Sequence, residues 1–147
     1  MNTSFKSKFF DELSNRELYE IMRSRAQIFL LEQGIICQDL DGVDYKALHC
    51  FLEDEGKIQA YLRAYKTDAE GVAKIGRVLS ITHGIGLGTR LMQTAIPEIK
   101  TKLGCNTIII SAQKHAQEFY ETLGFSVSSE EYLEENVPHV AMILENI

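Results

Sequence analysis

The sequence predicts an α/β fold with one mixed sheet of about six or seven strands, mostly antiparallel around a central parallel pair, and about four flanking helices. Two observations predict it. Three β-rich runs between residues 48 and 81 are separated by turn-forming residues, as in an antiparallel meander. Two strand–helix–strand passages follow, and such passages align strands in parallel. The length corresponds to one domain, which we expect to span residues 1–147.

The N-terminal part is predicted to form a short strand over Phe5–Phe10 and then an amphipathic helix. Ser14 and Glu17 have the spacing of a capping box at a helix start. Apolar residues then recur at spacings of three and four up to Gly34, a residue typical of a helix C-terminus. The polar residues 35–47 include an Asp-Gly turn and are predicted to form a long loop.

After the meander, the spacing of apolar residues along the chain changes to that of a helix. This helix is expected to begin at Gly86 and to end near Leu103, followed by Gly104. The remaining elements are a strand buried on both faces, a second amphipathic helix and two more strands, over residues 106–112, 113–124, 125–128 and 137–144.

The composition argues against several classes of partner. The 15 Lys and Arg residues are scattered among 21 Asp and Glu residues, so there is no basic footprint for nucleic acid. Three cysteines at unrelated spacings predict free thiols in a reducing compartment. The N-terminus has no apolar run of signal-peptide length, and no segment approaches the ~20 apolar residues of a membrane-spanning helix. We therefore expect a soluble, cytoplasmic protein that binds neither nucleic acid nor membrane.

A glycine-rich turn joins the last strand of the meander to the next helix. Gly84, Gly86 and Gly88 leave room beside the unpaired N–H groups of a helix start, which bind phosphate well. The turn lacks the Gly-Lys-Ser/Thr of a nucleotide P-loop and the acidic residue of a dinucleotide fold. From this pattern alone, a phosphate-binding loop and a tight turn without a ligand remain equally open.

The later amphipathic helix carries an aromatic pair, Phe119 and Tyr120. Aromatic residues at such spacing more often belong to a core than to a catalytic site. The Tyr120 phenol is nevertheless a possible proton donor.

At these two segments together, the chain resembles the GNAT acetyltransferases. The acetyl-CoA loop of that family reads Arg/Gln-x-x-Gly-x-Gly/Ala, and His83, Gly86 and Gly88 stand at those positions. The family's Phe-Tyr-x-x-x-Gly-Phe run is matched by residues 119–125. The N-terminal helix end, the Asp-rich loop and the C-terminal segment are similar to the ElaA-like branch. His83 departs from the usual Arg or Gln, and the loop is about two residues shorter than is usual there.

The resemblance implies an acetyl-CoA-dependent N-acyltransferase in which an amine attacks the thioester directly, without an acyl-enzyme. Backbone N–H groups of the loop would bind the CoA diphosphate, and the preceding strand would pair with the pantetheine arm. The implied cofactor-binding residues are Val78, Leu79, Ser80, His83, Gly84, Ile85, Gly86, Leu87, Gly88 and Thr89.

The resemblance also suggests the catalytic groups. Tyr120 would protonate the departing CoA thiolate, although it could instead only contact the sulfur and pack its helix. Glu32, near the family's acceptor site, is the candidate general base. The base remains open, since other candidates are Asp39, Asp41, Asp44, His49 and His139. The aspartate loop lacks the further oxygens of a calcium loop, so no metal is expected. Its carboxylates would attract a cationic acceptor, which favours a small-molecule or peptide amine.

Two other functions remain open. His83 and the short loop allow a CoA-binding module of the same fold with weak or lost turnover. The chain could also be an interaction domain in which the glycine turn holds no ligand. The acceptor amine, the acyl chain length and the oligomeric state are not determined by the sequence, and a homodimer is among the states it allows.

Overall fold

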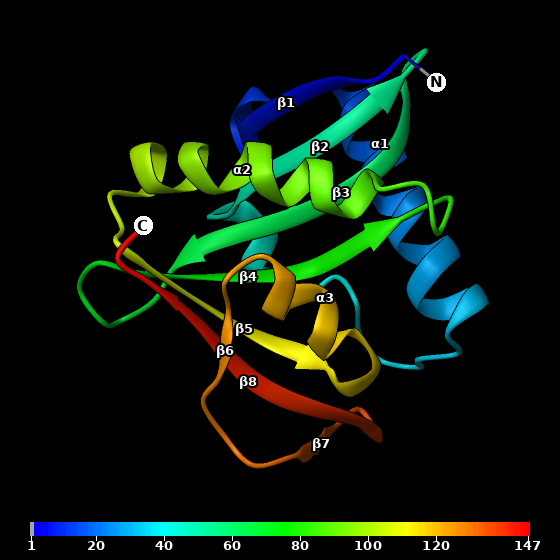
Figure 1. The fold of residues 1–147 in the computed structure, drawn as a ribbon. Helices are drawn as coiled ribbons and strands as arrows, with labels where there is room; N and C mark the ends of the chain where they lie inside the picture. Colours follow the sequence, from blue (N-terminus) through cyan, green and yellow to red (C-terminus); the bar gives the residue numbers. More distant parts are fainter. Residues whose placement is uncertain (1) are drawn as a thin grey trace.

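The computed structural model describes residues 2–147. It consists of one mixed sheet with helices on both faces (Figure 1). Its eight strands are β1 (Ser4–Phe9), β2 (Leu48–Asp54), β3 (Lys57–Lys66), β4 (Val72–Ser80), β5 (Thr107–Gln113), β6 (Ser126–Val127), β7 (Tyr132–Glu134) and β8 (Val137–Glu145). The α-helices are α1 (Asn15–Arg25), α2 (Leu87–Leu103) and α3 (Gln117–Thr122), and the other helical turns are η1 (Phe10–Glu12), η2 (Ala26–Glu32), η3 (Val43–Tyr45) and η4 (Lys114–Ala116). The predicted fold class is confirmed, and the short β7 is the strand that the sequence did not predict.

The sheet contains the parallel pair that the sequence predicted. Its strand order is β1-β2-β3-β4-β5-β8-β6, and β7 pairs with β8. Strands β4 and β5 run parallel, but their pairing covers only residues 72–75 and 107–110. Beyond that point the two strands diverge, as Figure 1 shows (green and yellow). The divergence leaves one edge of each strand without a strand partner.

Two apolar clusters hold the helices against the sheet. On one face, α2 packs on β1 to β4, and α3 packs on β5 and β6. On the opposite face, Ile21 of α1 and Ile28 of η2 pack with Phe51, Tyr61 and Leu79. Within residues 2–147, no helix has the length and apolarity needed to cross a membrane.

The first helix begins as predicted but changes its winding. Ser14 and Glu17 form the capping box. Burial of the Glu17 carboxyl raises its pKa, but hydrogen bonds from the Ser14 N–H and from Lys8 and Lys6 outweigh burial and lower it to about 2. The predicted continuous α-helix is α-helical only to Arg25; η2 has the wider π winding, which often marks functional sites.

Candidate functional site

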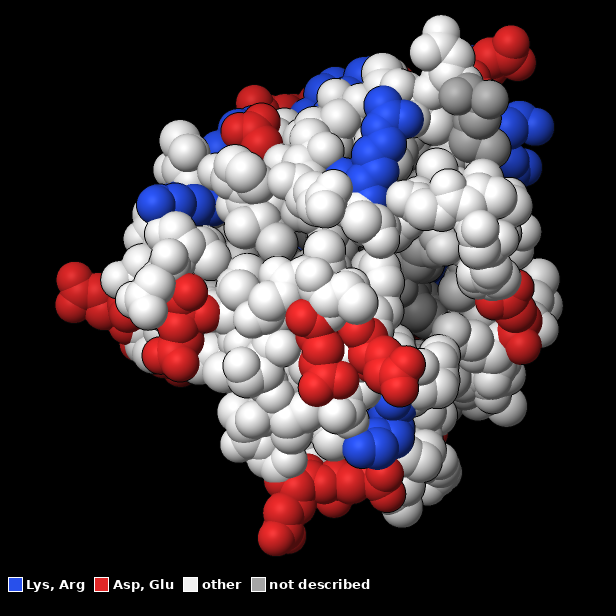
Figure 2. All heavy atoms as spheres, in the orientation of Figure 1, with Lys and Arg blue, Asp and Glu red and all other residues white. Residues whose placement is uncertain are grey.

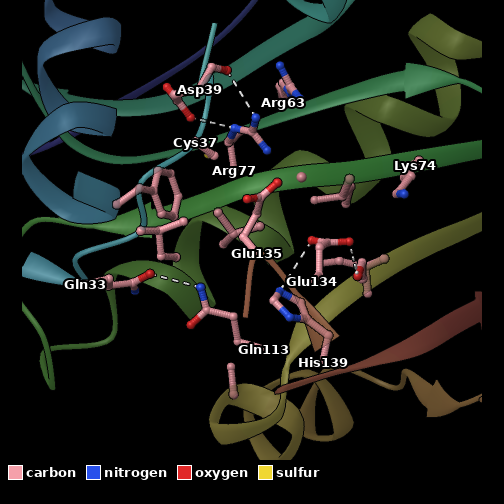
Figure 3. A pocket seen from close by; sticks show the side chains of 18 of the residues that line it. Gln33, Cys37, Asp39, Arg63, Lys74, Arg77, Gln113, Glu134, Glu135 and His139 are labelled. Carbon is pink, nitrogen blue, oxygen red and sulfur yellow. Dashed lines mark hydrogen bonds and ion pairs between the residues drawn. The ribbon is translucent and has the colours of Figure 1, made fainter. Parts of the chain in front are cut away.

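A cavity of about 610 Å³ opens where β4 and β5 diverge. Its walls come from β4, β5, α3, the loop after η2 and the β7–β8 turn. The space-filling view in Figure 2 shows the surface hollowed between α3 and the end of β4. Figure 3 shows Gln33 and Gln113 meeting across one side of it, with an amide–amide hydrogen bond of 2.9 Å. The cavity is therefore bounded by segments that are far apart in the sequence.

A β-bulge in β4 accompanies the divergence. Two steps along β3, from Tyr61 to Arg63, oppose three steps along β4, from Gly76 to Leu79. Arg77 lies in the bulge with a φ of 55°, in the left-handed region that side chains rarely adopt. Its guanidinium contacts Asp39 at 2.8 Å (Figure 3), which holds this conformation. Arg77 and Val78 both line the cavity.

The glycine-rich turn has the geometry of an anion-binding helix start. Gly84 and Gly86 have φ values of 79° and 81°, and a Cβ at either position would meet nothing within 4 Å. The backbone N–H groups of Leu87, Gly88 and Thr89 have no acceptor among residues 2–147. These donors, at the positive end of the 17-residue helix α2, fit a phosphate group.

Gly88 has a different reason to lack a side chain. A Cβ at Gly88 would lie 3.2 Å from Cζ of Phe119, closer than most real Cβ contacts. Gly88 therefore allows α2 and α3 to pack closely, whereas Gly84 and Gly86 allow the positive φ values of the turn.

Two predicted site residues, Glu32 and His83, contact each other outside the cavity lining. Nε2 of His83 lies 2.9 Å from Oε2 of Glu32, and their side chains are 61% and 46% exposed. His83 belongs to the glycine turn, whereas Glu32 ends η2. The structure therefore places Glu32 at the glycine-rich turn and not in the cavity between β4 and β5.

Tyr120 lies in the cavity wall and is only 6% exposed. Its ring packs edge-to-face against Phe119 and Phe125. Its hydroxyl makes no hydrogen bond within residues 2–147, and burial raises its pKa. The phenol is therefore held protonated at neutral pH beside an open space. Of the predicted strand residues, Val78 also lines this space, while the Leu79 side chain packs on the opposite face of the sheet.

The aspartate loop is locked by arginines that the sequence analysis did not identify. Arg25 is fully buried and contacts Asp44 at 2.6 Å and Asp39 at 2.9 Å. Arg63 binds both carboxylate oxygens of Asp41 at 2.7 and 2.8 Å and also contacts Asp44. Hydrogen bonding to Arg63 holds the pKa of Asp41 well below its usual range. Because Arg77 also contacts Asp39, three guanidinium groups neutralise the three carboxylates of the loop. The expectation that this loop attracts a cationic acceptor is therefore wrong.

His49, one of the candidate bases, is a buried structural residue. Its Nε2 donates to the Asp44 carbonyl at 2.9 Å, so Nδ1 accepts from the Tyr61 hydroxyl at 2.7 Å. The ring has no exposed surface and does not line the cavity. Burial lowers the pKa of His49, which keeps the ring neutral.

His139, another candidate base, does line the cavity, together with Glu134 and Glu135 from the β7–β8 turn. The two glutamates were not identified from the sequence. Glu135 and Asn136 turn the chain with φ values of 50° and 61°, and neither is a glycine that would have marked a hairpin.

Sequence comparisons identify relatives along nearly the whole chain. The acetyltransferase (GNAT) domain family matches residues 40–146. A UPF0039 protein of Schizosaccharomyces pombe is 35% identical over 148 residues, which cover 98% of this chain and 98% of that protein. The protein ElaA of Escherichia coli is 31% identical over 141 residues, 92% of each chain.

Solved structures agree with these relatives. An acyl-CoA N-acyltransferase from Pseudomonas aeruginosa superposes with a TM-score of 0.89 at 33% identity, covering 97% of this chain and 99% of that one. The crystal structure of E. coli ElaA superposes with a TM-score of 0.90 at 29% identity, covering 98% of this chain and 100% of that one.

Proposed function

Because the chain belongs to the GNAT acetyltransferase family, we propose that it transfers an acetyl group from acetyl-CoA to an amine. One observation carries this proposal: the free edge of β4 and the Tyr120 phenol lie at the opening between β4 and β5, and the start of α2, with its unpaired N–H groups, packs through Gly88 against Phe119, the neighbour of Tyr120. These are the groups that a thioester with a diphosphate tail requires. The P. aeruginosa relative, named as an acyl-CoA N-acyltransferase, supports the same substrate class.

The glycine turn would hold the diphosphate. The N–H groups of Leu87, Gly88 and Thr89 would donate to its oxygens, and the open space at Gly84 and Gly86 would admit them. The edge of β4 over residues 76–80 would pair with the amides of the pantetheine arm, because β5 no longer occupies that edge.

The chemistry needs a neutral amine, a stabilised tetrahedral intermediate and a proton for the thiolate. The amine nitrogen attacks the thioester carbonyl carbon, and a backbone N–H of Val78–Ser80 would stabilise the oxygen that becomes negative. When the C–S bond breaks, the Tyr120 hydroxyl would give its proton to the sulfur. A phenol with its ordinary pKa is already protonated at neutral pH, and burial, which raises the pKa of Tyr120, acts in the same direction.

Two measurements test the function. Titration with acetyl-CoA should raise the melting temperature with concentration, because a ligand that binds only the native state stabilises it. Release of the CoA thiol should then depend on added amine. Binding without amine-dependent thiol release would favour the CoA-binding module. Its supporting observation is that Glu32, the base that the family resemblance implies, contacts His83 and does not line the cavity. Absence of binding would contradict both functions.

A further inference from the structure

The β7–β8 hairpin closes one end of the cavity with a histidine and a glutamate. The β5–β8 register places His139 opposite Gln113, the last residue of β5, and the β7–β8 register places it opposite Tyr132. The hairpin therefore lies beside the C-terminal end of β5, where β5 is no longer paired with β4. Figure 3 shows His139 and Glu134 pointing toward each other at this end.

The His139 ring is fixed in one orientation and one tautomer. Its Nδ1 lies 2.7 Å from the carbonyl oxygen of Val137, and because a carbonyl only accepts, Nδ1 must donate. The ring stacks on Tyr132 with centroids 6.1 Å apart and is 6% exposed. When the ring is neutral, its lone pair is therefore on Nε2, which makes no hydrogen bond within residues 2–147.

Glu134 presents a second acceptor next to this lone pair. Its Oε1 accepts from the Ser111 hydroxyl at 3.1 Å, and Ser111 is in turn hydrogen-bonded to the Tyr132 hydroxyl. Its Oε2 lies 3.5 Å from Nε2 of His139. With a neutral imidazole and an ionised carboxylate, two acceptors face each other at the cavity with no donor between them.

We propose that these two acceptors bind the ammonium group of the acceptor and that His139 removes its proton, an assignment that rests on the proposed acetyl transfer. An ammonium group carries three donors, so it can donate to Nε2 and to Oε2 at once. This pair selects a primary amine that is protonated at neutral pH, and its carboxylate disfavours anionic acceptors. His139 takes the place of Glu32 as the general base.

The proton steps balance. The ammonium N–H bond breaks, Nε2 of His139 gains the proton, and Glu134 stabilises the imidazolium. The neutral amine attacks the thioester carbon, and Tyr120 protonates the departing sulfur. The second proton of the attacking nitrogen restores the Tyr120 phenol, and His139 releases its proton to water. The net products are the amide, CoA thiol and one proton.

Turnover of a primary-amine panel tests His139 as the base, with spermidine, N-acetyl-lysine methyl ester and a peptide amino terminus as probes. At pH 7, His139→Gln should lower kcat/KM for the amine by about 10²–10⁴-fold, since the glutamine cannot take a proton, with little change in the acetyl-CoA KM. This loss of kcat/KM in His139→Gln should become smaller as the pH approaches the pKa of the amine itself, because less of the amine then needs a base. Glu134, Tyr132, Glu135 and His115 are the charged or titratable groups on the same side of the cavity as the imidazole. The rest of the cavity lining adds Lys74, Arg77, Arg63, Asp39, Asp41, Tyr65, Cys37 and Tyr120.

Glu134→Gln should raise the KM for the amine at least about ten-fold through loss of the charge. Glu131→Gln removes a nearby carboxylate that does not line the cavity and is the matched control. If the parent protein turns over an amine and His139→Gln does so at the parent rate at pH 7, the assignment is overturned.

A binding measurement separates this inference from the proposed function. Calorimetry of spermidine with the CoA-saturated protein needs no turnover. Binding to the parent protein that weakens at least ten-fold in Glu134→Gln, but not in Glu131→Gln, supports the ammonium site even if no thiol is released, in which case only the proposed acetyl transfer fails. Amine binding that is absent, or equal in all three proteins, overturns the site itself.

Discussion

Nε2 of His83 lies 2.9 Å from Oε2 of Glu32, a contact that joins the glycine turn before α2 to the end of η2 across 51 positions of the chain. The contact places a carboxylate at the glycine turn that precedes the proposed diphosphate-binding N–H groups. It also keeps this glutamate away from the cavity in which the amine would react. Both consequences can be tested at Glu32.

Glu32→Gln should tighten acetyl-CoA binding by about two- to five-fold, because it removes one exposed negative charge beside the phosphates. Amine-dependent thiol release should remain near the parent rate. Isothermal calorimetry and the thiol assay measure the two effects, with Glu70→Gln as a control for an exposed carboxylate in the β3–β4 turn. A hundred-fold loss of turnover with unchanged acetyl-CoA affinity would instead identify Glu32 as the base.

Gly86→Asp should weaken acetyl-CoA binding by about ten-fold or more, because it brings a carboxylate to the helix start that would hold the diphosphate. Gly86→Asn is the matched control, since asparagine has a similar size and tolerates the same positive φ without the charge. The two dissociation constants are measured by calorimetry. Equal affinity of the two variants, both folded, means that no phosphate lies at this turn.

Asp44→Asn should destabilise the fold by about 3–5 kcal/mol, because it leaves the buried charges of Arg25 and Arg63 with one partner fewer. Urea unfolding measures the loss. Asp68→Asn, at an exposed aspartate in the β3–β4 turn, should change stability by less than about 0.5 kcal/mol. A similar small change for Asp44→Asn would show that Asp39 and Asp41 hold the arginines without it.

Stability should fall when the pH drops below about 6.5, because burial lowers the pKa of His49 from its unfolded value near 6.5. The unfolded state then binds more protons than the folded state, so the contribution of His49 is complete above that pH and is lost below it. The paired aspartates act only below about pH 4, where their unfolded forms become protonated. Urea unfolding of the parent and of His49→Gln at pH 7.5 and 5.5 measures the contribution, and an identical pH dependence in both proteins would contradict it.

Local signals made much of the fold predictable. Three signals depend only on residues close together in the sequence. They are the capping box at Ser14, the change to helical spacing at Gly86 and the continuous apolar run of β5. The parallel pair followed from chain order and connection rules. The short β7 was missed because its turn uses Glu135 and Asn136 at positive φ in place of glycine.

The rest of the site depends on contacts that no local pattern encodes. The loop that carries Asp39 and Asp44 is held by Arg25, Arg63 and Arg77, which lie 14 to 38 positions away from their partners. Residue types alone do not say whether those aspartates attract a ligand or neutralise arginines. Spacing likewise identified the three glycines, but only packing separates Gly88 from the two in the turn.

The most direct test of acetyl transfer at the β4–β5 opening is the single-turnover rate of amine-dependent CoA thiol release by the parent protein and by Tyr120→Phe. This substitution keeps the ring that packs on Phe119 and Phe125 and removes only the hydroxyl. We expect one thiol per acetylated amine in the parent, a rate about 10²–10⁴-fold lower in the variant and, at steady state, an unchanged acetyl-CoA KM. Equal rates in both proteins would show that Tyr120 only packs its helix, and a parent protein that binds acetyl-CoA but never releases thiol to an amine would contradict acetyl transfer itself.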